Sequence, residues 1–151
     1  VSIVVLALVA VVGLAAGWRI RGGFADAAEA FALLLLFRFV MTWVGTLVGL
    51  AVGKEETAGQ LAVVLFPLAM VTNAYVPTGG MPGWLRTIAD WNPVSAVVQA
   101  CRELFGNLPA GYPVPDAWPM QHAVWASLLW SVLIILLFRT LAVRKYRSAT
   151  A

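Results

Sequence analysis

The chain has 151 residues, of which 62% are hydrophobic and 11% charged, and its formal net charge at pH 7 is +3. Soluble domains carry about 25% charged residues, so this composition, with a mean hydropathy of +0.88, excludes an ordinary soluble protein and indicates a membrane protein. The small and scattered positive charge argues against nucleic acid as a partner, and the single cysteine excludes an internal disulfide and a cysteine-rich metal site.

Apolar runs along the chain predict four membrane-spanning helices, because about 20 apolar residues are needed to cross about 30 Å of hydrocarbon. The spans cover residues 1–17, 27–52, 57–76 and 119–138, and together they form one all-helical (all-α), polytopic unit. The first run starts at Val1 without a Met or a charged leader, which indicates a fragment or processed piece and argues against a signal peptide. It is closed by "GWRIRGG", whose tryptophan and arginines suit a membrane interface.

Arg38 lies near the middle of the second span, where a charge costs roughly 2.5 to 3.5 kcal/mol on insertion scales. It shares a helical stripe with Thr42 and two glycines, so we predict that Arg38 points into the protein and is paired there; the alternative is an arginine that snorkels toward an interface. Pro67 is predicted to kink the third span. Glycines spaced four apart let another helix approach closely, and the candidates for such packing are Gly13, Gly17, Gly45, Gly49 and Gly53.

The stretch "VPTGGMPGWLRTIADWNPVSAVVQACRELFGN" separates the third and fourth spans and predicts two short helices, at about residues 82–91 and 93–105. Pro82 suits a first helical position, and Asn92 can cap the second helix with Pro93 at its first position. At 1.5 Å per residue, each helix is roughly 15 to 20 Å long and cannot cross the bilayer. The pair therefore either dips into the membrane as a re-entrant hairpin or lies at the surface as an interfacial loop, and the residues alone leave both open.

Both short helices are predicted to be amphipathic. Asp90 follows Arg86 by four positions, a spacing at which such a pair can meet, so Asp90 and Glu103 are interpreted as solvated or paired with Arg86 and Arg102. The apolar stripes comprise Trp84, Leu85, Ile88 and Trp91 on the first helix and Val94, Val97, Val98, Cys101, Leu104 and Phe105 on the second.

Charge distribution predicts the orientation of the spans. In a four-span topology the turn at Lys54 and the tail after residue 138 share one side, opposite residues 18–23 and 76–118. The positive-inside rule gives most weight to charges close to the membrane, so the dense tail predicts a cytoplasmic C-terminus. The charges compared are Lys54, Arg139, Arg144, Lys145 and Arg147 on one side and Arg19, Arg21, Arg86 and Arg102 on the other.

Catalytic chemistry finds little support in the sequence. "GLAVGKE" superficially resembles a P-loop, but it has one residue too few between its glycines, and Glu55 stands where a Ser or Thr should bind Mg²⁺. His122 has no Cys, Asp or Glu at ligand spacing, which favours an interfacial hydrogen bond over metal binding or acid–base work. Cys101 lies on an apolar stripe and is interpreted as a packed residue. We therefore predict no enzymatic activity, no cofactor and no metal site in this chain.

The run "FPLAMVTNAYVPTGGMPGWLRTIADWNPVSAVVQACRELFGN" resembles the signature of ABC transporter type-2 permeases, specifically the daunorubicin-resistance-like membrane subunits. The shared elements are a span with an internal proline, an outer "VP", then "MPGWL", "NPVSAV" and "CREL" followed by glycine. The resemblance implies a six-helix permease of the bacterial cytoplasmic membrane, of which the last four spans are present here and the first two spans and the coupling helix are not. It also implies a second permease subunit, as a homodimer, separate ABC ATPase subunits, and an outer position for the short helix pair.

This resemblance favours the membrane part of an ATP-driven exporter for a hydrophobic or amphipathic compound, such as a drug, an antibiotic, a lipid or a glycolipid. A non-transporting scaffold or assembly subunit is the alternative, and the lack of a histidine and acid constellation in the spans argues against an intramembrane hydrolase. In an exporter, the short helix pair becomes the candidate outer gate, and the plug residues are Trp84, Leu85, Ile88, Trp91, Val94, Val97, Cys101 and Phe105.

Overall fold

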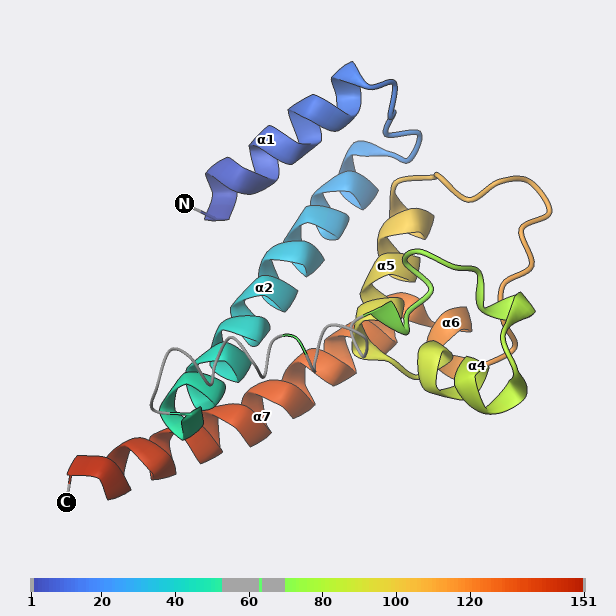
Figure 1. Cartoon of the computed structure of the whole chain (residues 1–151). Coiled ribbons are helices and arrows are strands. Elements are labelled where there is room, and N and C mark those ends of the chain that lie inside the picture. Colours follow the sequence, from blue (N-terminus) through green and yellow to red (C-terminus); the bar gives the residue numbers. More distant parts are fainter. Residues whose placement is uncertain (1, 53–62, 64–69, 151) are drawn as a thin grey trace.

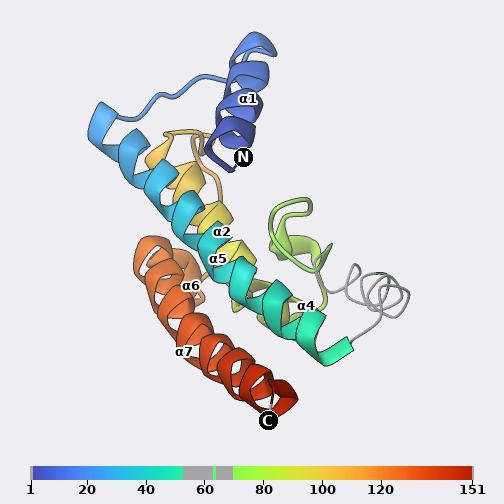
Figure 2. The ribbon, with the colours of Figure 1, turned by 90° about the vertical axis from the view of Figure 1, so that its left-hand side faces the viewer.

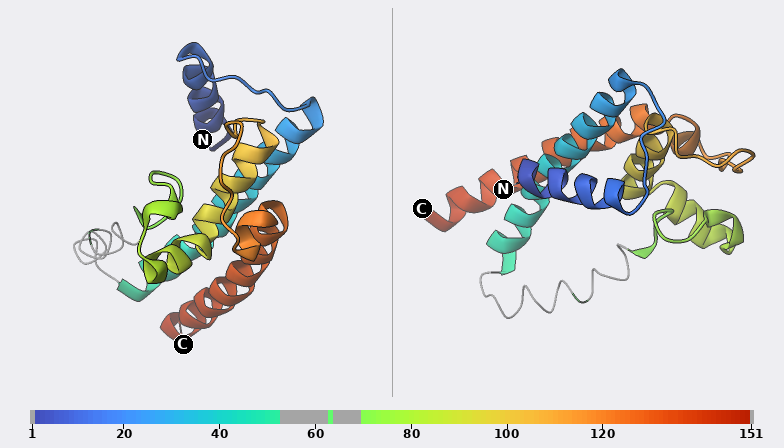
Figure 3. Two further views of the ribbon diagram at one scale, coloured as in Figure 1. Left: turned by 90° about the vertical axis from the view of Figure 1, so that its right-hand side faces the viewer. Right: turned by 90° about the horizontal axis from the view of Figure 1, so that it is seen from above.

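The computed structural model describes residues 2–52, 63 and 70–150, and within these ranges the chain is helical and contains no strand. The packed centre consists of α2, α5 and α7, while η1 and α4 lie on the side of α5 away from α2 (Figures 1 and 3). The elements in chain order are α1 (Ser2–Ala15), α2 (Phe24–Val52), η1 (Thr78–Gly80), α4 (Gly83–Asp90), α5 (Pro93–Leu104), α6 (Trp118–Gln121) and α7 (Ala123–Thr150).

Two helices are long and apolar enough to cross a membrane. They are Phe24–Val52, with 29 residues, and Ala123–Arg147, with 25 residues, and an 18-residue apolar stretch within each has a mean hydropathy of 2.0 and 2.2, respectively. At 1.5 Å per residue these lengths correspond to about 43 and about 37 Å, more than the hydrocarbon layer requires. The two helices run in the same direction, so their C-terminal ends lie at the same end of the molecule (Figures 1 and 2).

The first predicted span is observed as α1, a 14-residue apolar helix of about 21 Å, which is shorter than the hydrocarbon layer. It ends two residues earlier than predicted because Gly17 adopts a left-handed conformation, with φ of 99°. The N–H groups of Gly17 and Trp18 donate to the carbonyls of Leu14 and Gly13, which is the hydrogen-bond pattern of a Schellman motif. Gly17 therefore terminates this helix and lies outside it.

Most of the predicted third span, residues 57–76, lies outside the described residues, as do its kink at Pro67, the packing glycine Gly53 and the turn at Lys54. Of the described residues in this range, 63 and 70 are helical, whereas residues 71–76 form bends and turns and are not helical as predicted. The reason is tertiary. The N–H of Asn73 donates to Ser95 Oγ, 3.0 Å away on α5, instead of to a helical carbonyl.

The predicted fourth span, residues 119–138, differs from the observed helices at both ends. Its start forms the separate short helix α6, and the backbone breaks at His122, where φ is −126° and ψ is 50°. Its end continues as helix to Thr150, through the basic tail. The prediction ended the span where the hydropathy falls, but Arg and Lys are good helix formers, so helical structure persists beyond the apolar run.

The helix α5 starts where the sequence predicts and ends at Leu104, one residue before the predicted end, with Phe105 as its C-cap. Asn92 is its N-cap, with Oδ1 accepting a hydrogen bond from Val94 N at 2.8 Å, and Pro93 occupies the first turn. At the other end, Gly106 has a φ of 66°, and the N–H groups of Gly106 and Asn107 donate to Glu103 and Arg102 in a second Schellman motif. The neighbouring helix α4 begins one residue later than predicted, because Pro82 precedes its first turn.

Small residues dominate the contacts among α2, α5 and α7. Small side chains let helix axes approach closely, which is typical of helix packing in membranes. Long aliphatic side chains on α1, α2 and α7 instead point outward and are exposed, as expected for surfaces that face lipid. The buried residues of the three central helices include Ala27, Ala30, Leu33, Val40, Ala96, Val97, Ala100, Ala123, Ala126, Ser127, Ser131 and Ala142.

Candidate functional site

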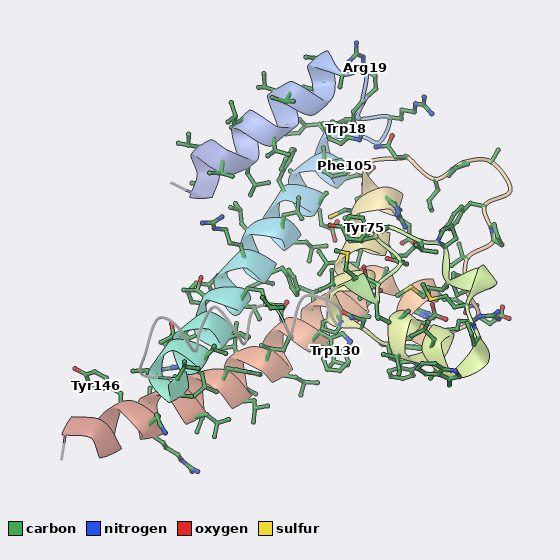
Figure 4. The ribbon with its side chains drawn as sticks, in the orientation of Figure 1. Trp18, Arg19, Tyr75, Phe105, Trp130 and Tyr146 are labelled. Carbon is green, nitrogen blue, oxygen red and sulfur yellow. The ribbon has the colours of Figure 1, made fainter. Side chains whose placement is uncertain are left out.

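The C-terminal end of α5 is fixed to the connection between α1 and α2. Phe105 is 7% exposed and packs edge-to-face against Trp18 and Phe31, with ring centroids 5.0 and 5.4 Å away (Figure 4). Its carbonyl accepts hydrogen bonds from the N–H groups of Arg21 and Gly22, at 2.9 and 3.2 Å. This end of α5 is therefore held by both aromatic packing and backbone hydrogen bonds.

Polar side chains of α5 and its N-cap hold the turn formed by residues 71–74. Asn92 Nδ2 donates to the carbonyl of Val71 at 3.1 Å, and Ser95 Oγ accepts from the N–H of residue 73. Arg102 Nη2 donates to the carbonyls of residues 73 and 74, at 3.0 and 3.2 Å. Each of these groups would otherwise lack a partner in a partly buried position, so the contacts fix the turn to α5.

The buried face of α5 coincides only in part with the apolar stripe that the sequence predicts. Of that stripe, Val97 and Phe105 are buried, while the other members are only partly buried. The buried face also includes Ser95 and Gln99, which are fully buried. Gln99 donates to Glu103 Oε1 at 2.9 Å, so Glu103 is paired with its own helix neighbour and not with Arg102.

The two predicted plug stripes have different surroundings in the described part of the chain. On α4, Trp84, Ile88 and Trp91 are 69, 52 and 51% exposed, and the buried residues of that helix are Ala89 and Asp90. On α5, Cys101 and Phe105 instead line a groove of about 370 Å³ beside Trp18. Leu85 and Val94 are partly buried. The stripe of α4 is thus an outward-facing apolar surface, and the stripe of α5 belongs to the packed interior and its groove.

Burial also changes the chemistry of the cysteine. It raises the pKa of the Cys101 thiol from 9.0 to about 11, so the thiolate is scarce at neutral pH. The thiolate is the nucleophilic form, so the raised pKa disfavours reaction at Cys101. Among the described residues there is no group of three or more metal-ligating side chains, and His122 stacks on Trp118 with ring centroids 5.4 Å apart.

Comparison with known proteins identifies the chain. Residues 1–105 match the ABC-2 type transporter family. The chain belongs to this family. A daunorubicin resistance ABC transporter permease protein, DrrB1 of Streptomyces coeruleorubidus, is 33% identical to the chain over 150 residues, which are 99% of this chain and 50% of that protein. This ABC-2 chain therefore spans about half the length of the curated relative that it matches, and no solved structure matches it.

One face of α2 is left uncovered by the described parts of this ABC-2 chain. Arg38, Thr42, Gly45 and Gly49 are exposed, and a Cβ atom added at either glycine would meet nothing within 4 Å. At Gly13, by contrast, an added Cβ would touch Trp18 at 3.6 Å. The predicted packing stripe of α2 thus faces away from the other described helices.

The hydrogen bonds between α5 and residues 71–74 were not predicted from the sequence, although the spacing of polar residues on this helix is a signal for them. Asn92, Ser95, Gln99 and Arg102 are spaced by three, four and three positions, so they lie on one face of the helix. Polar residues at helical spacing in a membrane protein mark a face that needs hydrogen-bond partners, and this face finds them in the 71–74 turn.

Proposed function

We propose that this chain is part of the membrane-spanning permease of an ATP-driven exporter that moves a hydrophobic or amphipathic compound out across the cytoplasmic membrane. The membership of the ABC-2 family carries the proposal. It is supported by the similarity to a daunorubicin resistance permease and by two helices that are long and apolar enough to span a membrane. ATP hydrolysis then belongs to a separate ABC ATPase subunit.

The cytoplasmic side is proposed to be the end where α2 and α7 finish. The last turns of α7 carry Arg139 and Arg144, and the positive-inside rule favours such charges at the cytoplasmic surface. The connection between α1 and α2 and the segment from residue 71 to residue 117 then face outside. This arrangement supports an outer position for α4 and α5.

A second permease subunit, as a homodimer, is proposed to cover the exposed face of α2. Glycines at Gly45 and Gly49 permit close approach of another helix, and Arg38 on the same face would find its partner there or in the part of the protein outside this chain. An intramembrane arginine without such a partner would be costly, which supports an assembled state as the functional one.

The short helices are proposed to form the outer gate. Since α5 is bound to the 71–74 turn and to the connection between α1 and α2, a movement of the neighbouring spans would be transmitted to α5. Its partner α4 presents Trp84, Ile88 and Trp91 outward, where these side chains can close against another part of the assembled transporter.

The proposed function is tested with the complete permease and its ATPase subunit in inside-out vesicles. We expect ATP-dependent accumulation of daunorubicin or another amphipathic compound, which is lost when the nucleotide is a non-hydrolysable analogue. Stable co-purification with the ATPase without transport of any compound in a broad panel would instead support the scaffold alternative.

A further inference from the structure

A pocket of about 370 Å³ lies between η1, α4 and residues 112–117. It is separate from the groove beside Cys101 and uses none of the proposed plug residues. Its walls combine apolar surface, from Tyr112 and the prolines at 77, 113 and 115, with four polar residues. Pockets of this size with a few converging polar groups are typical of small-molecule sites. Those polar residues are Thr78, Arg86, Asp90 and Asp116.

Arg86 builds one wall of this pocket. Its Nε donates to the carbonyl of Thr78 at 3.1 Å, and its Nη2 donates to the carbonyls of Gly79 and Met81 at 2.8 and 3.3 Å. These three hydrogen bonds fix η1 to α4. The guanidinium is thus engaged with backbone oxygens and does not form the pair with Asp90 that was one of the two alternatives left by the sequence.

Asp90 is the unusual group in the pocket wall. The sequence led us to interpret it as solvated or paired with Arg86, but Asp90 is 4% exposed, and its Oδ1 has no hydrogen-bond partner in the part of the chain that the structure describes. Thr78, 2% exposed, lines the same pocket with an Oγ1 that also lacks a partner. An unpaired buried carboxylate oxygen costs more than a neutral polar atom, so Asp90 and Thr78 require a donor that the described residues do not supply.

The formal charges of the lining are one positive, on Arg86, and two negative, on Asp90 and Asp116. The excess negative charge favours a cation, the unpartnered Asp90 oxygen requires N–H donors, and the tyrosine and proline walls favour an apolar body beside the charge. We propose that this pocket binds a primary ammonium group carried by an amphipathic molecule, with Asp90 and Thr78 as its hydrogen-bonding residues.

Two sources offer this chemistry, an amphipathic amine in solution and the ethanolamine headgroup of a phospholipid. The assignment of the ammonium group to the exported compound rests on the proposed function, because in that function the pocket lies on the outer side of the membrane, where the compound leaves. Binding itself requires neither ATP nor transport, so it is tested independently of export.

The test uses the complete protein in phosphatidylcholine vesicles, with its native cysteines replaced and a single cysteine introduced by Val114→Cys on the pocket wall. The rate of labelling by an impermeant maleimide reports occupancy. We expect 4-phenylbutylamine to protect this cysteine, and 4-phenylbutanol, which has the same apolar body without the charge, to require about 10- to 100-fold higher concentration, as expected for loss of a hydrogen bond to a charged group. Equal protection by both compounds, or by neither, overturns the proposal.

Variants of Asp90 and Asp116 show which of the two carboxylates binds the ammonium group. Asp90→Asn should raise the half-protecting concentration of the amine by at least tenfold, whereas Asp116→Asn, on the exposed rim, should change it less than threefold. A cysteine at Ala110, outside the pocket, should label at an unchanged rate in every variant, which verifies folding. Protection that persists in Asp90→Asn contradicts the assignment, and the amine–alcohol comparison in the parent protein stands even where that variant fails to fold.

Addition of phosphatidylethanolamine to the vesicles separates the two sources. Slower labelling of Val114→Cys without added amine shows that the lipid headgroup supplies the ammonium. An unchanged rate, with protection by the soluble amine retained, shows that a solute supplies it.

Discussion

Arg38 lies midway along α2, and the described part of the chain offers its side chain no ion-pairing partner. Its backbone carbonyl accepts a hydrogen bond from Thr42 Oγ1, at 3.1 Å. If Arg38 is paired in the assembled transporter, Arg38→Leu removes a charge-assisted hydrogen bond, and we expect export to fall by about tenfold or more while membrane insertion is kept. ATP-driven transport in vesicles measures this.

The control for that variant is Arg38→Lys, which keeps the charge and should retain part of the activity. Wild-type expression, assembly and export in Arg38→Leu would exclude a required internal charge and favour an arginine that snorkels to the interface.

Cys101 should be an unreactive thiol at neutral pH. Because its pKa is raised to about 11, the thiolate fraction at pH 8 is lower than for an ordinary cysteine, and we expect maleimide to react about 10- to 100-fold more slowly. The rate should rise with pH until about pH 11. Rates are compared with Glu103→Cys in a Cys101→Ser background, an exposed position on the same helix. Equal rates at the two positions at pH 8 would contradict the burial of the thiol.

At the scale of elements, the C-terminal end of α5 lies very close to the connection between α1 and α2. A Cβ added at Gly106 would lie 2.9 Å from Gly22 N, and one added at Gly22 would collide with the carbonyl of Leu104. Gly111 offers a matched comparison, because its φ of 75° is similar to the 66° of Gly106 but nothing lies within 4 Å of its added Cβ.

We therefore expect Gly106→Ala to be more destabilising than Gly111→Ala. Both variants incur the backbone strain of a left-handed alanine, about 1–2 kcal/mol, but only Gly106→Ala also displaces the connection from α5. Thermal unfolding of the purified protein measures the difference. Equal thermal unfolding midpoints for the two variants would show that the close contact between α5 and the α1–α2 connection does not contribute to stability.

The two halves of the proposed gate call for different variants. Phe105 belongs to the aromatic cluster with Trp18 and Phe31, so Phe105→Ala should cost about 3–5 kcal/mol of stability and confound a transport assay. Trp91 is half-exposed on α4, and its truncation should leave the fold intact. We expect Trp91→Ala to lower export several-fold while ATP hydrolysis continues, because the plug would close poorly.

The control for the gate variant is Trp125→Ala, which truncates a tryptophan that is 68% exposed on α7 and outside the proposed gate. Transport and substrate-stimulated ATP hydrolysis are measured together in both variants. Normal values for both activities in Trp91→Ala would leave α4 as an interfacial anchor.

At the scale of the whole molecule, α2 and α7 run in the same direction, so their N-terminal ends lie at one end of the molecule and their C-terminal ends at the other. The proposed topology assigns one side of the membrane to each end. We predict that cysteines placed at Gly80 and Ala110 react with an impermeant reagent added outside intact cells, whereas a cysteine at Lys54 reacts only after permeabilisation. A Cys101→Ser background removes the native thiol of this chain. Labelling of position 54 from outside would reverse the orientation.

Local signals in the sequence were sufficient to predict the fold class and several helix boundaries. Low charge and long apolar runs determined an all-helical membrane protein, and the residues from Asn92 to Gly106 determined the limits of α5, because caps act on the nearest backbone groups. The signature around "MPGWL" and "NPVSAV" was also sufficient to predict the family, which the comparison confirmed.

Tertiary structure alone decided which faces those helices bury. The polar side chains of α5 found partners in the 71–74 turn, Asp90 became buried beside Arg86 without pairing, and the apolar stripe of α4 turned outward. In a soluble protein, apolar side chains mark the buried face, but in a membrane protein lipid is as apolar as the core. Helix contacts are then selected by small size and by hydrogen-bond partners far apart in the chain, which no local pattern of hydrophobicity encodes.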